Sequence, residues 1–138
     1  MGASQRAKGA AFERWVANEL TEALGLDTPL RRNLDQYQVA DCSDLVLPPF
    51  QIECKRYAVN GSGTWFRNDW WEQVCRSVED GFMPALCFKY DRHPVRWVLP
   101  VVALNEAWVG AESEYEPFAT SWDGGVMIMR EWVDNADL

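Results

Sequence analysis

The 138-residue chain lacks the motifs of several common enzyme classes. It contains no G-x-S-x-G elbow, P-loop or G-x-G-x-x-G fingerprint, which excludes the usual serine hydrolases, nucleoside triphosphatases and dinucleotide-binding enzymes. Its single histidine, His93, argues against HNH nucleases and histidine-based zinc hydrolases, because those centres need more than one imidazole. A catalytic site in this chain must therefore be of another kind.

Two further absences concern cysteine pairs and long hydrophobic runs. The four cysteines form no C-x-x-C pair, which argues against a structural zinc site or a thioredoxin-like motif, so we interpret them as reduced thiols. No apolar run approaches the roughly 20 residues that span a bilayer, and residues 1–10 show no signal-peptide pattern. We therefore expect no membrane partner and a cytoplasmic location, in a bacterial, archaeal or phage-infected host cell.

The chain is acidic, with a formal net charge of -8, but this charge is distributed unevenly. Residues 1–100 hold 12 Lys and Arg against 13 Asp and Glu, whereas residues 101–138 hold one against eight. A local basic surface for DNA is therefore compatible with the first hundred residues. The length predicts a single domain over residues 1–138, with a core at about 5–100 and an acidic C-terminal extension, 101–138, packed on it.

Helical spacing predicts a first helix from Ser4 to about Leu24, with Gly25 as its stop. The side predicted to be buried carries Phe12, Trp15, Val16, Leu20 and Ala23. The opposite side carries Glu13 among small residues. Glu13 by itself would be a solvated helix carboxylate, and its surroundings are the reason to consider it for a site.

Two strands are predicted next, at 44–47 and 50–55, joined by Pro48-Pro49, which cannot continue a central strand. In the second strand, apolar residues alternate with Gln51, Glu53 and Lys55, so one side is apolar and the other pairs a carboxylate with an amine. A weaker edge strand is predicted at 36–40.

The rest of the chain is predicted to hold a second helix at 65–80 and a strand–turn–strand at 85–90 and 95–100. The second helix is expected to bury Trp71, Val74, Cys75 and Val78 and to present Trp70, Gln73, Arg76 and Ser77 on its other side. A short helix at 104–109, an acidic loop and a final strand at 126–129 complete the prediction. The order of helix, strands, helix and strands predicts an α/β fold.

The predicted hairpin brings two carboxylates together. If it turns symmetrically about Pro48-Pro49, Asp44 stands opposite Glu53, with Cβ atoms about 5 Å apart. Like charges at that distance repel, and a shared divalent cation relieves the repulsion. A slipped register would make Asp41 a substitute for Asp44, because two prolines cannot form a tight type I′ turn.

Lys55 lies two residues after Glu53 and on the same side of the strand. There it can orient an attacking water or stabilise charge that develops on a phosphate, while one or two Mg²⁺ ions, for which Mn²⁺ can substitute, activate the water. The backbone carbonyl of Cys54 is the natural additional ligand. Phosphodiester hydrolysis needs this combination of groups.

The spacing of Asp44 from Glu53-Cys54-Lys55 resembles the signature of the PD-(D/E)XK, or restriction-endonuclease-like, nucleases. The Glu-Cys-Lys form, the helical Glu13 and the downstream Gln73 are similar to the Holliday junction resolvase branch, with its archaeal and phage members. The resemblance covers about residues 6–100 and implies an αβββαβ core with a mixed central sheet flanked by helices. It also implies that Glu13 is a metal ligand or site organiser and that Gln73 supports the site. One departure is Cys42-Ser43, where the family often has Gly-Ser.

Several basic and aromatic side chains are candidates for DNA contacts. Possible phosphate contacts are Lys8, Arg14, Arg31, Arg32, Arg56, Arg67 and Arg76, each of which could equally be an ordinary exposed cation. Trp65, Phe66, Trp70 and Trp71 either stack on exposed bases or line a dimer interface, although Trp71 is most simply a core residue.

The function that we expect is a Mg²⁺-dependent, structure-selective DNA endonuclease acting in recombination and repair, as a homodimeric Holliday junction resolvase. A homodimer is expected because symmetric cleavage of a four-way junction needs two matched active sites. One alternative is a nicking, exonucleolytic or restriction-type enzyme on the same core. Another, from a different class, is a catalytically silent module that binds a protein partner.

Overall fold

The computed structural model describes residues 3–30, 44–59 and 63–136. Its helices are α1 (Ala3–Leu24), α2 (Asn68–Ser77) and α3 (Trp122–Ala136), and its strands are β1 (Leu45–Leu47), β2 (Phe50–Tyr57), β3 (Met83–Tyr90), β4 (Arg96–Pro100) and β5 (Pro117–Ser121). Two 3₁₀ turns, η2 (Val101–Leu104) and η3 (Glu106–Trp108), follow β4. None of the described helices has the length and hydrophobicity that a transmembrane segment requires.

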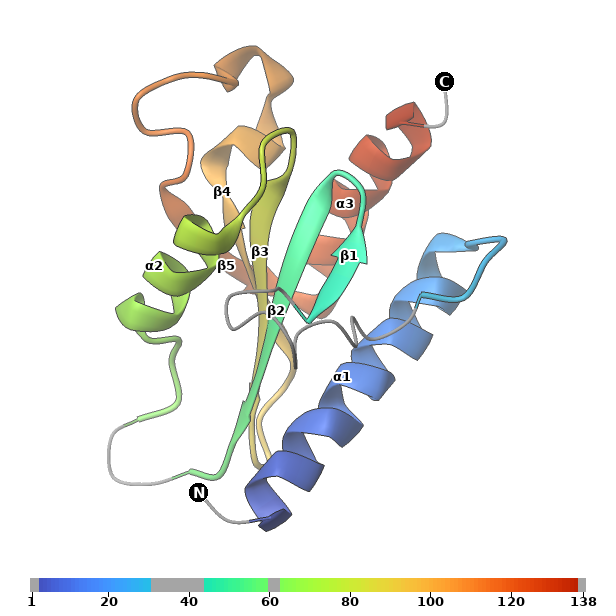
Figure 1. The fold of residues 1–138 in the computed structure, drawn as a ribbon, viewed down its shortest axis with the longest axis vertical. Coiled ribbons are helices and arrows are strands. Elements are labelled where there is room, and N and C mark those ends of the chain that lie inside the picture. The colour runs from blue at the N-terminus through green and yellow to red at the C-terminus, as the bar shows by residue number, and fades with distance from the viewer. Residues whose placement is uncertain (1–2, 31–43, 60–62, 137–138) are drawn as a thin grey trace.

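The five strands form one mixed sheet in the order β1-β2-β3-β4-β5 (Figure 1). β2 and β3 are parallel, and α2 is the crossover that a parallel pair requires, whereas the other neighbouring pairs are antiparallel. The fold is therefore the predicted α/β architecture, a mixed sheet flanked by helices. The edge strand predicted at 36–40 lies outside the described residues.

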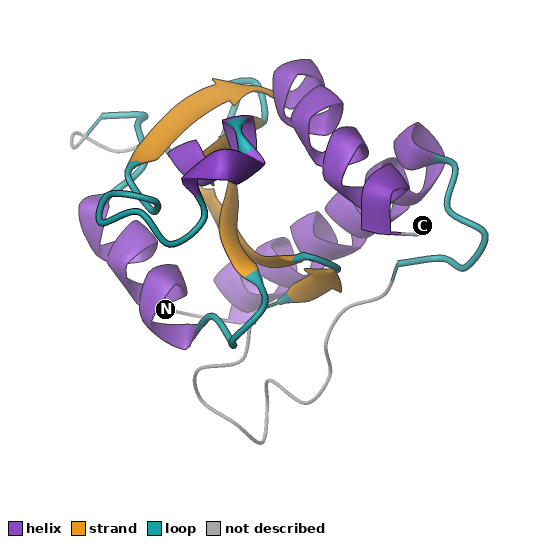
Figure 2. Ribbon diagram, turned by 90° about the horizontal axis from the view of Figure 1, so that it is seen from above, coloured by secondary structure: helices purple, strands orange, loops and turns teal. Residues whose placement is uncertain are grey.

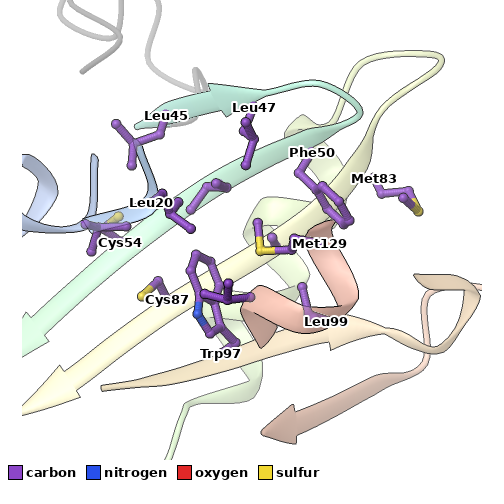
Figure 3. Close-up of a cluster of buried hydrophobic side chains, with 14 of the residues drawn as sticks. Leu20, Leu45, Leu47, Phe50, Cys54, Met83, Cys87, Trp97, Leu99 and Met129 are labelled. Carbon is purple, nitrogen blue, oxygen red and sulfur yellow. The ribbon is translucent and has the colours of Figure 1, made fainter. Parts of the chain in front are cut away.

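Helices cover both sides of the sheet. α1 and α3 lie on one side, which we call the α1 face, and α2 lies on the other, the α2 face (Figures 1 and 2). The larger core cluster fills the α1 face, where Leu20 of α1 and Met129 of α3 meet the sheet (Figure 3). A smaller cluster on the α2 face joins Trp70, Trp71 and Val74 to the sheet.

The alternation of β2 decides which side chains reach which face. Phe50 and Ile52 are completely buried, and with Cys54 they belong to the cluster on the α1 face (Figure 3). Because successive strand residues point to opposite sides, Glu53 and Lys55 point to the α2 face. β2 also extends beyond its short partner β1, so the edge of its second half is not paired with β1.

The strand predicted at 126–129 is wrong, because these residues form the middle of α3. The apolar run Val-Met-Ile-Met suggested a buried strand, but a short apolar run fits a helix equally well. In the structure Val126 and Met129 are buried, and the partly buried Trp122 and Val133 pack against the same cluster. These four residues are three or four positions apart, which is the spacing of one side of a helix. The strand of this region is β5, which ends at Ser121, five residues before Val126.

Two predictions about aromatic side chains are also wrong. Trp15 was expected in the core, but 41% of its surface is exposed. Its ring packs on Phe12 and Trp122 at the border of the larger core cluster. Trp70 was expected on the outer side of the second helix but is buried, since α2 begins only at Asn68 and Trp70 stacks on Tyr57 of β2. The helix is shorter at both ends than the predicted range 65–80.

Candidate active site

The register of the β1–β2 hairpin is the predicted one. Leu45 pairs with Ile52 and Leu47 with Phe50 around the Pro48-Pro49 turn, so the next position outward sets Asp44 opposite Glu53. The two carboxyl side chains form a hydrogen bond with each other. The local sequence therefore suffices to bring this pair together.

Asp44 is fixed at the edge of the sheet where β1 begins. Its Oδ2 accepts a hydrogen bond of 2.8 Å from the backbone N–H of Cys54, and its side chain is buried. Because the N–H and C=O of one strand residue point to the same side, the Cys54 carbonyl faces this edge as well. Two residues on, the Arg56 carbonyl accepts a hydrogen bond of 2.7 Å from Nε2 of Gln5, a contact that the sequence did not suggest.

Lys55 accompanies Glu53 on the α2 face. Its Nζ lies 3.6 Å from Oε1 of Glu53, and both side chains are largely buried, with 19% and 14% of their surface exposed. The charge pair is therefore shielded from solvent much more than a surface ion pair. A lysine in this position can reach a phosphate oxygen bound beside Glu53.

Glu13 reaches this region from α1. It is buried, and its negative charge helps to raise the pKa of both Asp44 and Glu53. A buried carboxylate is uncommon, so Glu13 is not the solvated helix residue that it would be by default. The sequence signal was its position among small residues, of which Ala17 is also buried.

Burial and mutual repulsion control the protonation of the pair. Burial, followed by the charges of Glu53 and Glu13, raises the pKa of Asp44 to about 9, against the opposing effect of the Cys54 N–H. Burial also raises the pKa of Glu53, although Lys55 and the hydrogen bond with Asp44 act in the opposite direction. Near neutral pH, Asp44 is therefore the protonated member and donates to Glu53.

A divalent cation fits the chemistry of these donors. Two buried carboxyl groups and a carbonyl facing the same edge are hard oxygen ligands of the type that Mg²⁺ prefers. No three Asp, Glu, His or Cys side chains of the described residues form a cluster that could hold a metal ion by themselves. A cation at this edge would therefore depend on the Asp44–Glu53 pair together with backbone and water oxygens.

Comparison with known proteins supports this chemistry. The model of a family described as "Phage putative PDDEXK endonuclease" matches residues 4–123. The chain belongs to this family. A solved structure, the Holliday junction resolvase Hjc of the archaeal hyperthermophile Archaeoglobus fulgidus, is similar over 88% of this chain and 98% of that chain, with a TM-score of 0.50 and 19% identity. At that identity the similarity shows the fold. No curated protein matches the chain.

Gln73 lies on the same face of the sheet as Glu53 and Lys55, the face that α2 covers. At one end of α2, Trp70 stacks on Tyr57 with ring centroids 5.4 Å apart, and beyond the other end the Glu79 N–H donates to Oε1 of Gln51 at 2.7 Å. Gln73, half-buried, stands between these two contacts. Its support of the site remains a prediction.

The side chains predicted to contact phosphates have different surroundings in the structure. Lys8 and Arg56 both form ion pairs with Asp91, whose pKa is lowered mainly by the hydrogen bond from Arg56. Arg67 pairs with Asp69 at 3.0 Å. Arg14 and Arg76 are exposed, as is Arg67, whereas Arg31, Arg32 and the substitute ligand Asp41 lie outside the described residues. Asp91 was missed because a turn aspartate carries no distinctive sequence signal.

Proposed function

We propose that this protein is a divalent-metal-dependent DNA endonuclease whose active centre comprises Asp44, Glu53 and Lys55. The observation that carries the proposal is the buried carboxyl pair with a lysine 3.6 Å from one member. Burying two acidic side chains next to each other costs free energy unless a cation neutralises them. A binding site for a cation therefore explains this arrangement better than a purely structural role does. Membership of an endonuclease family supports the same activity.

Asp44, Glu53 and the Cys54 carbonyl would hold one or two Mg²⁺ ions, for which Mn²⁺ can substitute. When bound, the metal would activate a water and neutralise charge on the phosphate. Asp44 must lose its proton to become a ligand, and the Cys54 N–H helps to hold the resulting carboxylate in place. Within the described part of the chain, Glu13 does not form a three-residue ligand cluster with this pair, and it would organise the site from α1 through a bound water.

Lys55 acts on the substrate side of this centre. Its ammonium group would donate to a nonbridging phosphate oxygen or orient the attacking water, and its ion pair with Glu53 keeps it in the required position. Gln73 would support the same side from α2 through its amide group.

The proposed substrate is branched DNA, most specifically a four-way junction, cut by a homodimer. Two matched centres related by twofold symmetry would make paired cuts in opposing strands. The support is a fold shared with a protein described as a Holliday junction resolvase, together with a family of endonucleases. The fold alone does not define the substrate, so the cleavage pattern is the relevant measurement.

The first test is cleavage of a synthetic four-way junction with and without Mg²⁺. Lys55→Ala should lower the cleavage rate at least about 100-fold, because a group that stabilises developing charge is lost. Lys89→Ala is the matched control, since Lys89 lies on the neighbouring strand and points to the α1 face, as does its partner Arg56. Full activity of Lys55→Ala would refute the proposed centre.

The second test compares substrates. A resolvase should make symmetric paired cuts in the junction and leave linear duplex and flaps intact at the same enzyme concentration. Cleavage of duplex or flap at an equal rate would reject the junction specificity and retain the endonuclease. Absence of both metal binding in calorimetry and cleavage with Mg²⁺ or Mn²⁺ would instead favour the protein-binding alternative.

A further inference from the structure

An aromatic cavity lies beside the carboxyl end of β2, on the α2 face. Its volume is about 360 Å³. Its aromatic and charged lining residues are Tyr57, Trp65, Phe66, Arg67, Trp70 and Tyr90. We call this space the aromatic cavity. Five of these six residues have aromatic rings, and the sixth is a cation.

The aromatic cavity adjoins the proposed active centre. Tyr57 follows Lys55 by two residues on β2, so both side chains point to the α2 face, and their Cα atoms are about 7 Å apart along the strand. This spacing is similar to that of consecutive phosphates in an extended nucleic-acid strand. A nucleotide next to the one that contacts Lys55 can therefore reach the cavity.

The rings of the cavity are held in position by contacts with the sheet and with α2. Tyr57 and Trp70 are stacked, and the Tyr90 hydroxyl donates a hydrogen bond of 2.9 Å to the Trp65 carbonyl. The Arg96 guanidinium lies over the Trp65 ring, 5.5 Å from its centroid. Despite these contacts Trp65 remains 53% exposed, which leaves ring surface available for a ligand.

The charge around the aromatic cavity favours an anionic ligand with a flat ring. Arg67 contributes a guanidinium whose partner, Asp69, is itself well exposed, and such surface pairs exchange readily for a phosphate. Arg96 adds a second cation on the Trp65 ring. The cavity lined by Ala103, Glu106 and Glu131 has acidic groups instead, and in the cavity beside Trp15 the cations Lys8 and Arg56 are paired with Asp91.

We propose that the aromatic cavity binds an unpaired nucleobase of the DNA substrate, next to the phosphate that is cleaved. Base stacking on aromatic rings is sequence-tolerant, since every base has a flat π surface, and the two guanidinium groups would contact the flanking phosphates. The inference rests on the proposed function, which supplies DNA as the substrate. It adds that the enzyme recognises a base released from pairing at or near a branch point.

Binding is measured by fluorescence anisotropy with Ca²⁺ replacing Mg²⁺, on two duplexes that differ by one unpaired adenine. The wild-type protein should bind the bulged duplex about 10-fold more tightly, and Trp65→Ala should remove this preference without weakening binding to the paired duplex. Trp65→Phe should restore part of it. The matched control is Trp108→Ala, because Trp108 is similarly exposed, at 45%, but lies on η3, outside the cavity.

Three outcomes would overturn the proposal. The first is equal affinity of the wild-type protein for the two duplexes, and the second is an equal loss of affinity for both duplexes in Trp65→Ala. Either result would show that the cavity does not recognise an unpaired base. A shift of Trp65→Ala from dimer to monomer in sedimentation, with no effect specific to the bulge, would assign the cavity to a second copy of the chain. Unfolding is monitored by thermal melting, and Trp65→Phe still tests the cavity if Trp65→Ala melts early.

The failure of this inference can be distinguished from failure of the proposed function. A 2-aminopurine placed at the bulge reports stacking through its emission, whether or not DNA is cut. Trp65-dependent stacking without any Mg²⁺-dependent cleavage would support base binding in the cavity and contradict the proposed nuclease activity. Junction cleavage without any Trp65-dependent stacking would support the nuclease activity and contradict base binding in the cavity.

Discussion

The two faces of the sheet use the same strand for opposite purposes. On the α1 face, β2 contributes Phe50 and Ile52, both completely buried, to the larger core cluster that α1 and α3 cover. On the α2 face, the same strand contributes Glu53 and Lys55, and the ten-residue helix α2 covers only the smaller cluster. The strand period of two is what allows one segment to contribute to both the core and the proposed active centre.

The difference shows where this fold tolerates costly groups. Completely buried aliphatic and aromatic residues on the α1 face stabilise the domain, and that stability permits buried carboxyl groups on the other side and at the edge of β2. The α1 face should therefore be sensitive to changes in volume, and the α2 face to changes in charge.

The largest effect on stability is expected from Phe50→Ala. Phe50 is completely buried on the α1 face, so its truncation should cost about 3–5 kcal/mol in the free energy of unfolding, measured by urea denaturation. Lys55→Ala on the same strand should cost less than Phe50→Ala, because it opens no cavity in the core and Glu53 keeps its hydrogen bond with Asp44. Equal effects of the two substitutions would remove the contrast between the faces.

A smaller loss is expected from Gly125→Ala in α3. A Cβ at this position would lie 2.3 Å from Cδ1 of Trp97, a completely buried ring, so α3 would have to move away from the sheet. Such overpacking typically costs about 1–3 kcal/mol, and thermal melting would show it. Gly9→Ala in α1 is the control, since no atom lies within 4 Å of a Cβ there, and it should be neutral or slightly stabilising.

Asp44→Asn should separate stability from activity. The pKa of Asp44 is raised from 3.8 to about 9 in the folded protein, so its contribution to stability is full below pH 4 and is lost as pH rises toward 9. Asparagine mimics the protonated acid and does not titrate. Without divalent metal, the variant should therefore exceed the wild type in stability by at least about 1 kcal/mol at pH 8 and match it near pH 4.

The same variant should lose Mg²⁺-dependent cleavage, because the amide is a poor substitute for a carboxylate ligand. Melting curves between pH 4 and pH 9 in EDTA, together with a cleavage assay, test both halves. If the stability of the wild type relative to Asp44→Asn does not fall over this pH range, Asp44 is ionised in the metal-free fold.

Much of the hairpin could be predicted because it depends on neighbouring residues. The polar–apolar alternation around Glu53 and the double proline at 48–49 are local features, and they define both the side of each residue and the register. The first helix and its stop at Gly25, which has a φ of +62°, were predictable for the same reason.

The C-terminal region shows where local patterns were insufficient. The run around Val126 fits a buried strand or a buried helix by composition, and its helical form belongs with tertiary packing, in which Gly125 lies against Trp97 of β4. Trp70 was placed outside for a similar reason, since its contact with Tyr57 depends on where α2 crosses the sheet.

By itself, the sequence determined the α/β class through the order of its elements. It also determined the pairing of Asp44 with Glu53 and the phase of Lys55, because both follow from residues fewer than a dozen positions apart. Only the tertiary structure decided that β2 pairs in parallel with β3, that Glu13 is buried near the pair, and that Tyr57, Trp65 and Trp70 enclose a cavity beside it. These features depend on how distant segments pack, and packing is selected by the whole core rather than by any one stretch of chain.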